Sequence, residues 1–188
     1  MTLLLIILSI LSSFLTNLET KTLQSDFVLT MDEGQQRVSH YPGSCTMKGT
    51  CFTLSLPGHQ TAYDGKTMYV YSEDMDELTL TAPTEEELVE SHPLIFAKTL
   101  LGMCTVTEKP NKDGTQTIVT LTPNDPEYVG FNRFILKIRN ADQMPLYMET
   151  QGGSATYTLK LTNPEYNNTT PSFVIEPTET TFVNDLRL

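Results

Sequence analysis

The segment Tyr63–Tyr71 places a tight turn directly before a strand that is apolar on both faces. Asp64-Gly65 supplies the turn, because glycine adopts positive φ without steric cost. In Met68–Tyr71 the apolar and aromatic residues follow one another without interruption. A strand of an antiparallel sheet normally exposes one face to water and alternates polar with apolar residues. The second apolar face of this strand therefore indicates a surface that something else must cover or use.

Length and charge limit the classes of protein that fit. The 188 residues suit one domain with a core of its own. Twelve basic and 23 acidic residues give a formal net charge of −11. So negative a surface repels phosphate backbones and anionic lipid headgroups, which excludes nucleic acid as a partner.

The N-terminal residues allow two interpretations. Leu3–Leu8 is shorter than the ~20 apolar residues of a membrane span. It has the length of a signal-peptide core but lacks a preceding basic residue and a following small-x-small cleavage site. The apolar pattern also continues with helical spacing through Leu4, Ile7, Leu8, Leu11, Phe14, Leu15 and Leu18. Either residues 1–11 are a degenerate or truncated export signal that merges into the first helix, or the whole segment is one amphipathic helix lying on a sheet; residues 12–188 form a single domain.

Three cysteines leave at least one unpaired. Cys45 and Cys51 flank an expected Lys48-Gly49 hairpin turn and are close enough in sequence to pair across it. The alternative is that these two and Cys104 are small buried hydrophobic residues, and we favour it.

Turn residues divide the rest of the chain into short strands. The expected strands are Ser25–Thr30, Val38–Tyr41, Cys45–Met47, Cys51–Leu56, Met68–Tyr71, Glu77–Thr81, Met103–Lys109, Thr115–Thr122, Phe131–Arg139, Pro145–Thr150, Ala155–Thr162, Ser172–Glu176 and Phe182–Leu186. Between them, Thr84 and Glu87 form a capping box that begins a helix. Pro93 ends it and begins a second, almost wholly apolar helix that Gly102 ends. The pattern predicts an α+β fold, mainly antiparallel β, with an N-terminal helix and central helices.

The residues give no positive sign of catalysis. Gly65-Lys66-Thr67 resembles the end of a phosphate-binding loop, but Gln60 stands where that loop needs its first glycine. His40, His59 and His92 have no Cys, Asp or Glu at metal-ligand spacing. We therefore expect a protein that is not an enzyme and that carries no metal or other cofactor.

Several segments, in order, resemble the periplasmic outer-membrane lipoprotein carrier (LolA-like) family, and its Bacteroidetes-type branch in particular. The similar segments are Leu23–Thr30, Gly43–Leu54, Asp64–Tyr71, His92–Phe96, Phe173–Pro177 and Val183–Arg187. The resemblance covers the chain from about Leu11. The chain departs from the family pattern at Lys48-Gly49 and at His92, so a lid-latching role for a basic group in that hairpin turn is not carried over.

The resemblance implies an unclosed half β-barrel whose apolar concave face binds acyl chains beneath lid helices. The implied function is a periplasmic chaperone that carries lipoproteins from the inner to the outer membrane as a monomer. The implied partners are acylated lipoproteins, an inner-membrane lipoprotein-releasing transporter and an outer-membrane acceptor. The residues expected to line the acyl-chain site are Phe27, Leu29, Phe52, Leu54, Leu56, Tyr69 and Tyr71 on the sheet, with Leu94, Ile95, Phe96 and Leu100 on the lid.

Two other functions fit the same residues. One is a carrier of a different lipid, such as a glycolipid or a polyene acyl chain, on the same fold. The other is an extracytoplasmic sensor or structural β-domain whose apolar faces are only core. For Met68–Tyr71 we expect the tyrosines, and not Met68 and Val70, to face the cavity.

Overall fold

The computed structural model describes residues 2–34, 37–84, 87–88, 101–129, 131–153 and 155–187. Helix α1 spans Thr2–Thr20, and α4 is a single turn over Pro126–Val129. The strands are β1 (Thr22–Asp32), β2 (Val38–Lys48), β3 (Cys51–Leu56), β4 (His59–Tyr63), β5 (Met68–Ser72), β6 (Glu77–Thr81), β7 (Cys104–Pro110), β8 (Gln116–Pro123), β9 (Arg133–Arg139), β10 (Met144–Gly152), β11 (Ala155–Asn167) and β12 (Phe182–Asp185).

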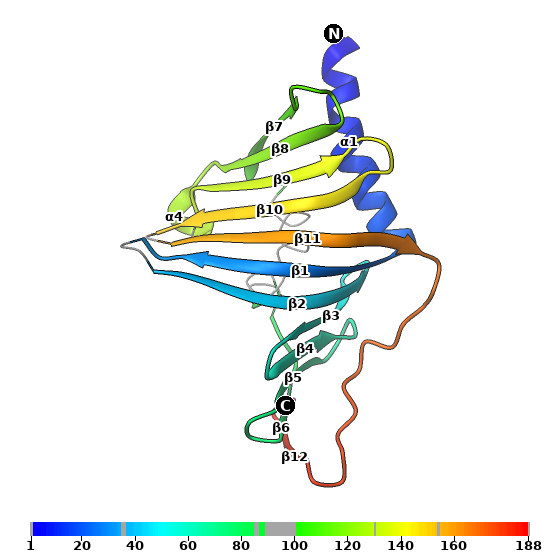
Figure 1. The fold of residues 1–188 in the computed structure, drawn as a ribbon, viewed down its shortest axis with the longest axis vertical. Helices are drawn as coiled ribbons and strands as arrows, with labels where there is room; N and C mark the ends of the chain where they lie inside the picture. Colours follow the sequence, from blue (N-terminus) through cyan, green and yellow to red (C-terminus); the bar gives the residue numbers. More distant parts are fainter. Residues whose placement is uncertain are drawn as a thin grey trace.

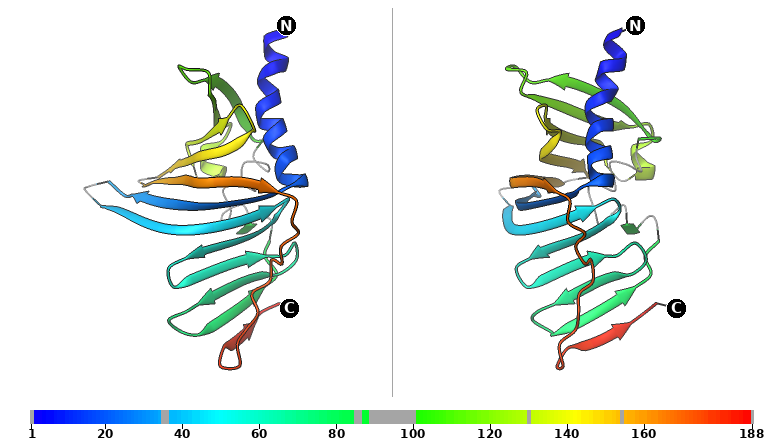
Figure 2. Two further views of the ribbon diagram at one scale, coloured as in Figure 1. Left: turned by 45° about the vertical axis from the view of Figure 1, so that its right-hand side comes forward. Right: turned by 90° about the vertical axis from the view of Figure 1, so that its right-hand side faces the viewer.

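The twelve strands in the described residues belong to one open sheet. Their order is β12-β6-β5-β4-β3-β2-β1-β11-β10-β9-β8-β7, so β12 and β7 are its two edges. Neighbouring strands are antiparallel except β12, which pairs with β6 in parallel. The sheet curves, and α1 runs across it from the β7 end toward β1 (Figures 1 and 2). The prediction of a mainly antiparallel, unclosed sheet with an N-terminal helix is confirmed.

The central helices were predicted from a capping box, and the box is present. The Thr84 amide donates to Glu87 Oε2 over 2.8 Å, and the Glu87 amide donates to Thr84 Oγ1 over 3.3 Å. Glu87 and Leu88 are helical, and residues 89–100 lie outside the described part of the chain. Within that part the helices are α1, α4 and this short turn, so the predicted lid helices are not supported there.

The strands differ from the prediction at several places. Val38–Tyr41 and Cys45–Met47 are one strand, β2, because Pro42-Gly43 continues the pairing with β1. The β4 strand was missed, and its first residue, His59, is exposed. Ser172–Glu176 is not a strand.

The expected break at Asn163-Pro164 is instead a β-bulge in β11. The register with β1 shifts between Gln24 and Asp26, and Asn163 has a φ of 52°. A bulge inserts one extra residue, so side chains beyond it change face. Leu159 and Leu161 precede the bulge at odd positions, whereas Tyr166 follows it at an even position. Because the bulge shifts the alternation by one residue, all three side chains join the same core. The bulge therefore keeps a long strand apolar on one side.

Gly43 allows β2 to pass under an aromatic ring. A Cβ at this position would lie 2.5 Å from Cζ of Phe27 and would also meet the Ser55 carbonyl oxygen. Since Phe27 is only 2% exposed, its ring has little room to move. We expect Gly43→Ala to lower the free energy of unfolding by roughly 1–3 kcal/mol, as overpacking does, in urea denaturation. Gly102→Ala is the control, because no atom of the described residues lies within 4 Å of its Cβ position; equal effects of the two substitutions would contradict this account.

We call the face of the sheet that packs against α1 the inner face, and the opposite face the outer face. The inner face carries Phe27, Phe52 and Leu136, which share one core with Leu11, Phe14 and Leu18 of α1. The outer face of β4, β5 and β6 carries a second, smaller cluster: Ala62, Tyr69, Leu78 and Leu80, with Tyr71 and Ile175 packed against it. Strand alternation places neighbouring residues on opposite faces, which is why the two clusters interleave along β5.

Helix α1 is continuous from Thr2 to Thr20 and contacts β1, β2 and β9. Leu11, Phe14 and Leu18 are buried and Leu15 is half-buried, as the helical spacing predicts. Its end is tied to the β2–β3 turn by the Gly49 amide, which donates to the Leu18 carbonyl over 2.7 Å. No helix in the described residues is long and apolar enough to cross a membrane.

The C-terminal segment runs from the end of β11 past β1–β6 and returns to the sheet as β12 (Figure 2). Ile175 packs on the outer cluster and Phe173 is buried. The segment is anchored at Asp76, whose carboxylate accepts hydrogen bonds from Thr180 over 2.8 Å and Thr181 over 2.9 Å. This segment is what covers the second apolar face of Met68–Tyr71.

Candidate functional site

A continuous row of cross-strand neighbours crosses seven strands on the inner face. In order, the row is Tyr41, Leu29, Leu159, Met148, Leu136, Val119 and Glu108. Neighbouring strands are ~4.8 Å apart, so the row extends over roughly 29 Å of curved sheet. Six of its members are apolar or aromatic, and only the last carries a charge.

Burial along this row is graded. Val119, Leu136 and Met148 are at most 2% exposed, Leu159 is 9% exposed, and Tyr41 at the far end is 41% exposed. Tyr157, two residues along β11 from Leu159 and on the same face, is 42% exposed. The row is thus packed beneath α1 at its centre and open at the tips of β1, β2 and β11.

A second inner-face row serves mainly as core. It consists of Leu23, Met47, Phe52, Tyr63 and Met68, each at most 8% exposed. The next row toward the open tips is less covered, since Leu54 is half-buried and Val70 is 40% exposed. Phe182 on β12 shares the face of Glu77 and is 65% exposed. Apolar surface therefore remains uncovered on the inner face toward both β12 and the strand tips.

Five of the predicted site residues lie together on the inner face: Phe27, Leu29, Phe52, Leu54 and Leu56. Phe27 and Phe52 are almost fully buried, which makes them core residues as well as part of the wall. Leu29, Leu54 and Leu56 are half-buried. The predicted lid residues Leu94, Ile95, Phe96 and Leu100 lie outside the described residues.

Tyr69 and Tyr71 lie on the outer face, so the expectation that the tyrosines face the cavity is wrong. Their strand partners are Leu80 and Leu78 of the outer cluster. Tyr69 donates to Asp64 Oδ2 over 3.0 Å, and Tyr71 donates to Asp76 Oδ1 over 3.2 Å. The two carboxylates thus accept the hydrogen bonds of both tyrosine hydroxyl groups on the outer face. Met68 and Val70 have no polar side-chain group and face inward.

The Asp64-Gly65 turn is as predicted. Asp64 Oδ1 accepts hydrogen bonds from the amides of Lys66 over 2.8 Å and Thr67 over 2.7 Å, and Gly65 has a φ of 98°. These hydrogen bonds lower the pKa of Asp64 even though burial opposes them.

The cysteines are unpaired. Cys45 faces inward with Leu54, whereas Cys51 pairs with Lys48 and points to the other face, so the two sulfurs cannot meet across the hairpin. Burial, with a contribution from Asp26, raises the pKa of Cys45 to about 12. Cys45 and Cys104 are buried hydrophobic residues, as we favoured, and Cys51 is half-buried.

Glu108 is the functional candidate that the sequence did not reveal. Strand β7 alternates in burial, with Cys104, Val106 and Glu108 facing inward, but its sequence gives no reason to single out the carboxylate. Oε1 of Glu108 is buried and has no hydrogen-bond partner among the described residues. Burial raises the pKa of Glu108, an effect that the backbone N–H of Leu11 partly offsets.

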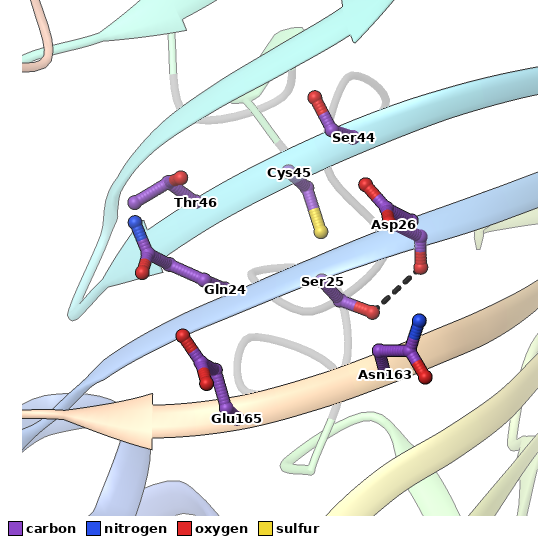
Figure 3. Close-up of a pocket in the computed structure, with 8 residues that line it drawn as sticks. All are labelled: Gln24, Ser25, Asp26, Ser44, Cys45, Thr46, Asn163 and Glu165. Atoms are coloured by element: carbon purple, nitrogen blue, oxygen red, sulfur yellow. Dashed lines mark hydrogen bonds between the residues drawn. The ribbon is translucent and has the colours of Figure 1, made fainter.

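A polar hollow of about 270 Å³ lies at the bulge, where β1, β2 and β11 meet (Figure 3). It is lined by Gln24, Ser25, Asp26, Ser44, Cys45, Thr46, Asn163 and Glu165. Ser25 Oγ donates to the Asp26 and Thr162 carbonyl oxygens over 2.6 and 3.0 Å, which anchors the bulge. The hollow is polar, so it offers nothing to an acyl chain. In the described residues no three His, Cys, Asp or Glu side chains gather as metal ligands would.

Comparison with known proteins finds similarity in fold and not in sequence. No family model matches the chain, and no curated protein matches it. Among solved structures, an uncharacterized conserved protein from Thermus thermophilus is 15% identical with a TM-score of 0.62, over 95% of this chain and 98% of that one. The Mycobacterium tuberculosis lipoprotein LppX is 12% identical with a TM-score of 0.51, over 89% of this chain and 97% of that one. A LolA superfamily protein from Nitrosomonas europaea is 9% identical with a TM-score of 0.41, over 82% of this chain and 92% of that one.

The first two similarities span nearly the whole length of each protein, so the open half-barrel is a fold that these proteins share.

Proposed function

We propose that this protein is a periplasmic carrier that binds the acyl chains of lipoproteins on the inner face of the sheet. The observation that carries the proposal is the long apolar row from Tyr41 to Val119, which is buried at its centre and open at one end. It is a binding protein in this account and not an enzyme.

The dimensions suit acyl chains. The ~30 Å hydrocarbon core of a bilayer holds two leaflets, so one chain spans roughly half that length. The apolar part of the row, from Tyr41 to Val119, crosses five strand spacings, or about 24 Å. It is therefore longer than one chain. Each methylene removed from water contributes ~0.8 kcal/mol, so shielding a long chain is strongly favourable.

Binding requires that whatever fills the inner face be displaced. Helix α1 supplies Leu11, Phe14 and Leu18 to the core that contains Leu136 and Val119. A ligand that binds the open arrangement better than the closed one shifts the population toward it. We assign this covering role to α1.

Release is as important as binding for a carrier. Met148, Met47 and Met68 line the inner face together with leucines. Unbranched, polarizable methionine adapts to variable apolar shapes, which favours a soft fit over tight complementarity. In this account cargo arrives from an inner-membrane lipoprotein-releasing transporter and leaves to an outer-membrane acceptor.

The test uses spheroplasts that contain radiolabelled acylated lipoproteins. Added protein should release lipoprotein into the soluble fraction as a complex that co-purifies with it, and native mass spectrometry should show one acylated polypeptide bound. Failure to extract any lipoprotein, with circular dichroism showing an intact fold, would refute the proposal. A glycolipid or polyene mass in place of a lipoprotein would support the alternative cargo on the same fold.

A further inference from the structure

Glu108 ends the apolar row on the inner face. It is paired with Val119 across β7 and β8, and Val119 is fully buried. From Val119 the row continues through Leu136 and Met148, so a chain lying along it would have one end at a carboxylate. The Glu108 side chain is half-buried, and its Oε1 atom is out of contact with water. Removing a carboxylate oxygen from water without giving it a hydrogen-bond partner costs free energy, so core packing alone does not favour this residue here.

Partners for this carboxylate are scarce. Glu108 Oε1 is inaccessible to water and accepts no hydrogen bond from the described residues. The ion pairs in the described part of the chain involve Arg37, Arg133, Arg139 and Arg187, and none reaches Glu108. Among the described residues, the Leu11 backbone N–H on α1 acts on the Glu108 carboxylate, and α1 is the element that a ligand would displace. Displacement of α1 would remove this donor, and a ligand lying in its place would have to supply another.

We propose that Glu108 binds the polar head of the ligand by accepting a hydrogen bond from an N–H group, on an ammonium or an amide nitrogen. This inference rests on the proposed function and names the class of apolar ligand that the site selects. A charge-assisted hydrogen bond in an apolar surrounding is stronger than a neutral one, so an ammonium head is favoured over an amide. The carboxylate would repel an anionic head, and a head without an N–H donor would leave the buried Oε1 atom without a hydrogen bond.

The test compares three probes of equal chain length: dodecylamine, N-dodecylacetamide and dodecanoate. Each displaces a fluorescent apolar dye from the full chain. The variants are Glu108→Gln and, as the matched control, Glu165→Gln, which removes the same charge from the polar hollow at the bulge. The net charge of −11 attracts any cation. Both variants change that charge by the same amount, so this general attraction affects the two variants equally.

Wild-type protein and Glu165→Gln should bind dodecylamine at least ~10-fold more tightly than dodecanoate, since a hydrogen bond to a charged group is stronger than one between neutral groups. In Glu108→Gln this ratio should fall to within about threefold of unity, while N-dodecylacetamide binding changes little, because the Gln oxygen still accepts an N–H. Should Glu108→Gln fail to fold, Glu108→Asp replaces it and should give an intermediate ratio.

An unchanged ratio in Glu108→Gln would overturn the inference and leave the proposed function standing. Equal reductions in Glu108→Gln and Glu165→Gln would overturn it too, since net charge alone would then explain the preference. Failure of all three probes to displace the dye from wild-type protein would instead remove the proposed function itself.

Discussion

Leu29→Asp should reduce the affinity for a fluorescent apolar probe by at least ~30-fold. Leu29 lies in the inner-face row between Tyr41 and Leu159 and is half-buried near the open end. Losing contact with one leucine side chain costs ~2 kcal/mol, and a carboxylate in the path of the chain adds a desolvation penalty. Since ~1.4 kcal/mol corresponds to a tenfold change in the dissociation constant, the combined effect is large. Fluorescence titration measures it directly.

Val28→Asp is the matched control for this change. Val28 is the preceding residue on the same strand, points to the outer face and is 37% exposed. The same charge therefore enters the same strand on the other side of the sheet. We expect its probe affinity to stay within about twofold of wild type. If both variants lose affinity equally, the inner face is not the binding surface.

Phe14→Ala should destabilise the protein more than any other single change in α1. Phe14 is fully buried in the inner core, which includes Leu23 and Phe134. Truncating a buried phenylalanine costs ~3–5 kcal/mol through lost transfer free energy and the cavity left behind. Chemical denaturation with urea, monitored by circular dichroism, checks this value.

Ser13→Ala provides the control for Phe14→Ala, because Ser13 is the adjacent residue on the exposed side of the same helix. Its effect should be within ~0.5 kcal/mol of wild type. A loss below ~1 kcal/mol for Phe14→Ala, far under the usual cost of such a truncation, would show that α1 is not docked on the inner face in solution.

Patterns that depend on neighbouring residues were predictable from the sequence. The alternation of Phe52, Leu54 and Leu56 with Thr53 and Ser55 predicted β3 with its observed bounds. The capping box at Thr84 and Glu87 and the turn at Asp64-Gly65 formed as expected, because their hydrogen bonds join residues close together in the chain.

Features that depend on distant partners were not predictable. Tyr69 and Tyr71 face outward because Ile175, much later in the chain, covers that side of the sheet. Pro42-Gly43 continues a strand because the Phe27 ring needs the space of a missing side chain. Asn163-Pro164 forms a bulge and not a strand end because β1 continues beside it. Glu108 belongs to the candidate site only through its pairing with Val119 and the approach of α1.

The strand Met68–Tyr71 is apolar on two sides for two different reasons. Met68 faces the inner core, whereas Tyr69 and Tyr71 pack under the C-terminal segment. The outer face of this strand is thus a structural surface, and the ligand-binding proposal concerns only the inner one.

In the proposed complex, an acyl chain lies along the inner-face row. A palmitate analogue with a photoreactive group on the chain, bound at low ratio and irradiated, labels the residues it touches, which tandem mass spectrometry identifies. We predict labels on Leu29, Met148 and Leu159, with none on Val28 or the outer cluster of Tyr69, Leu78 and Leu80. Labels on that outer cluster, or labels spread evenly over both faces, would contradict the account.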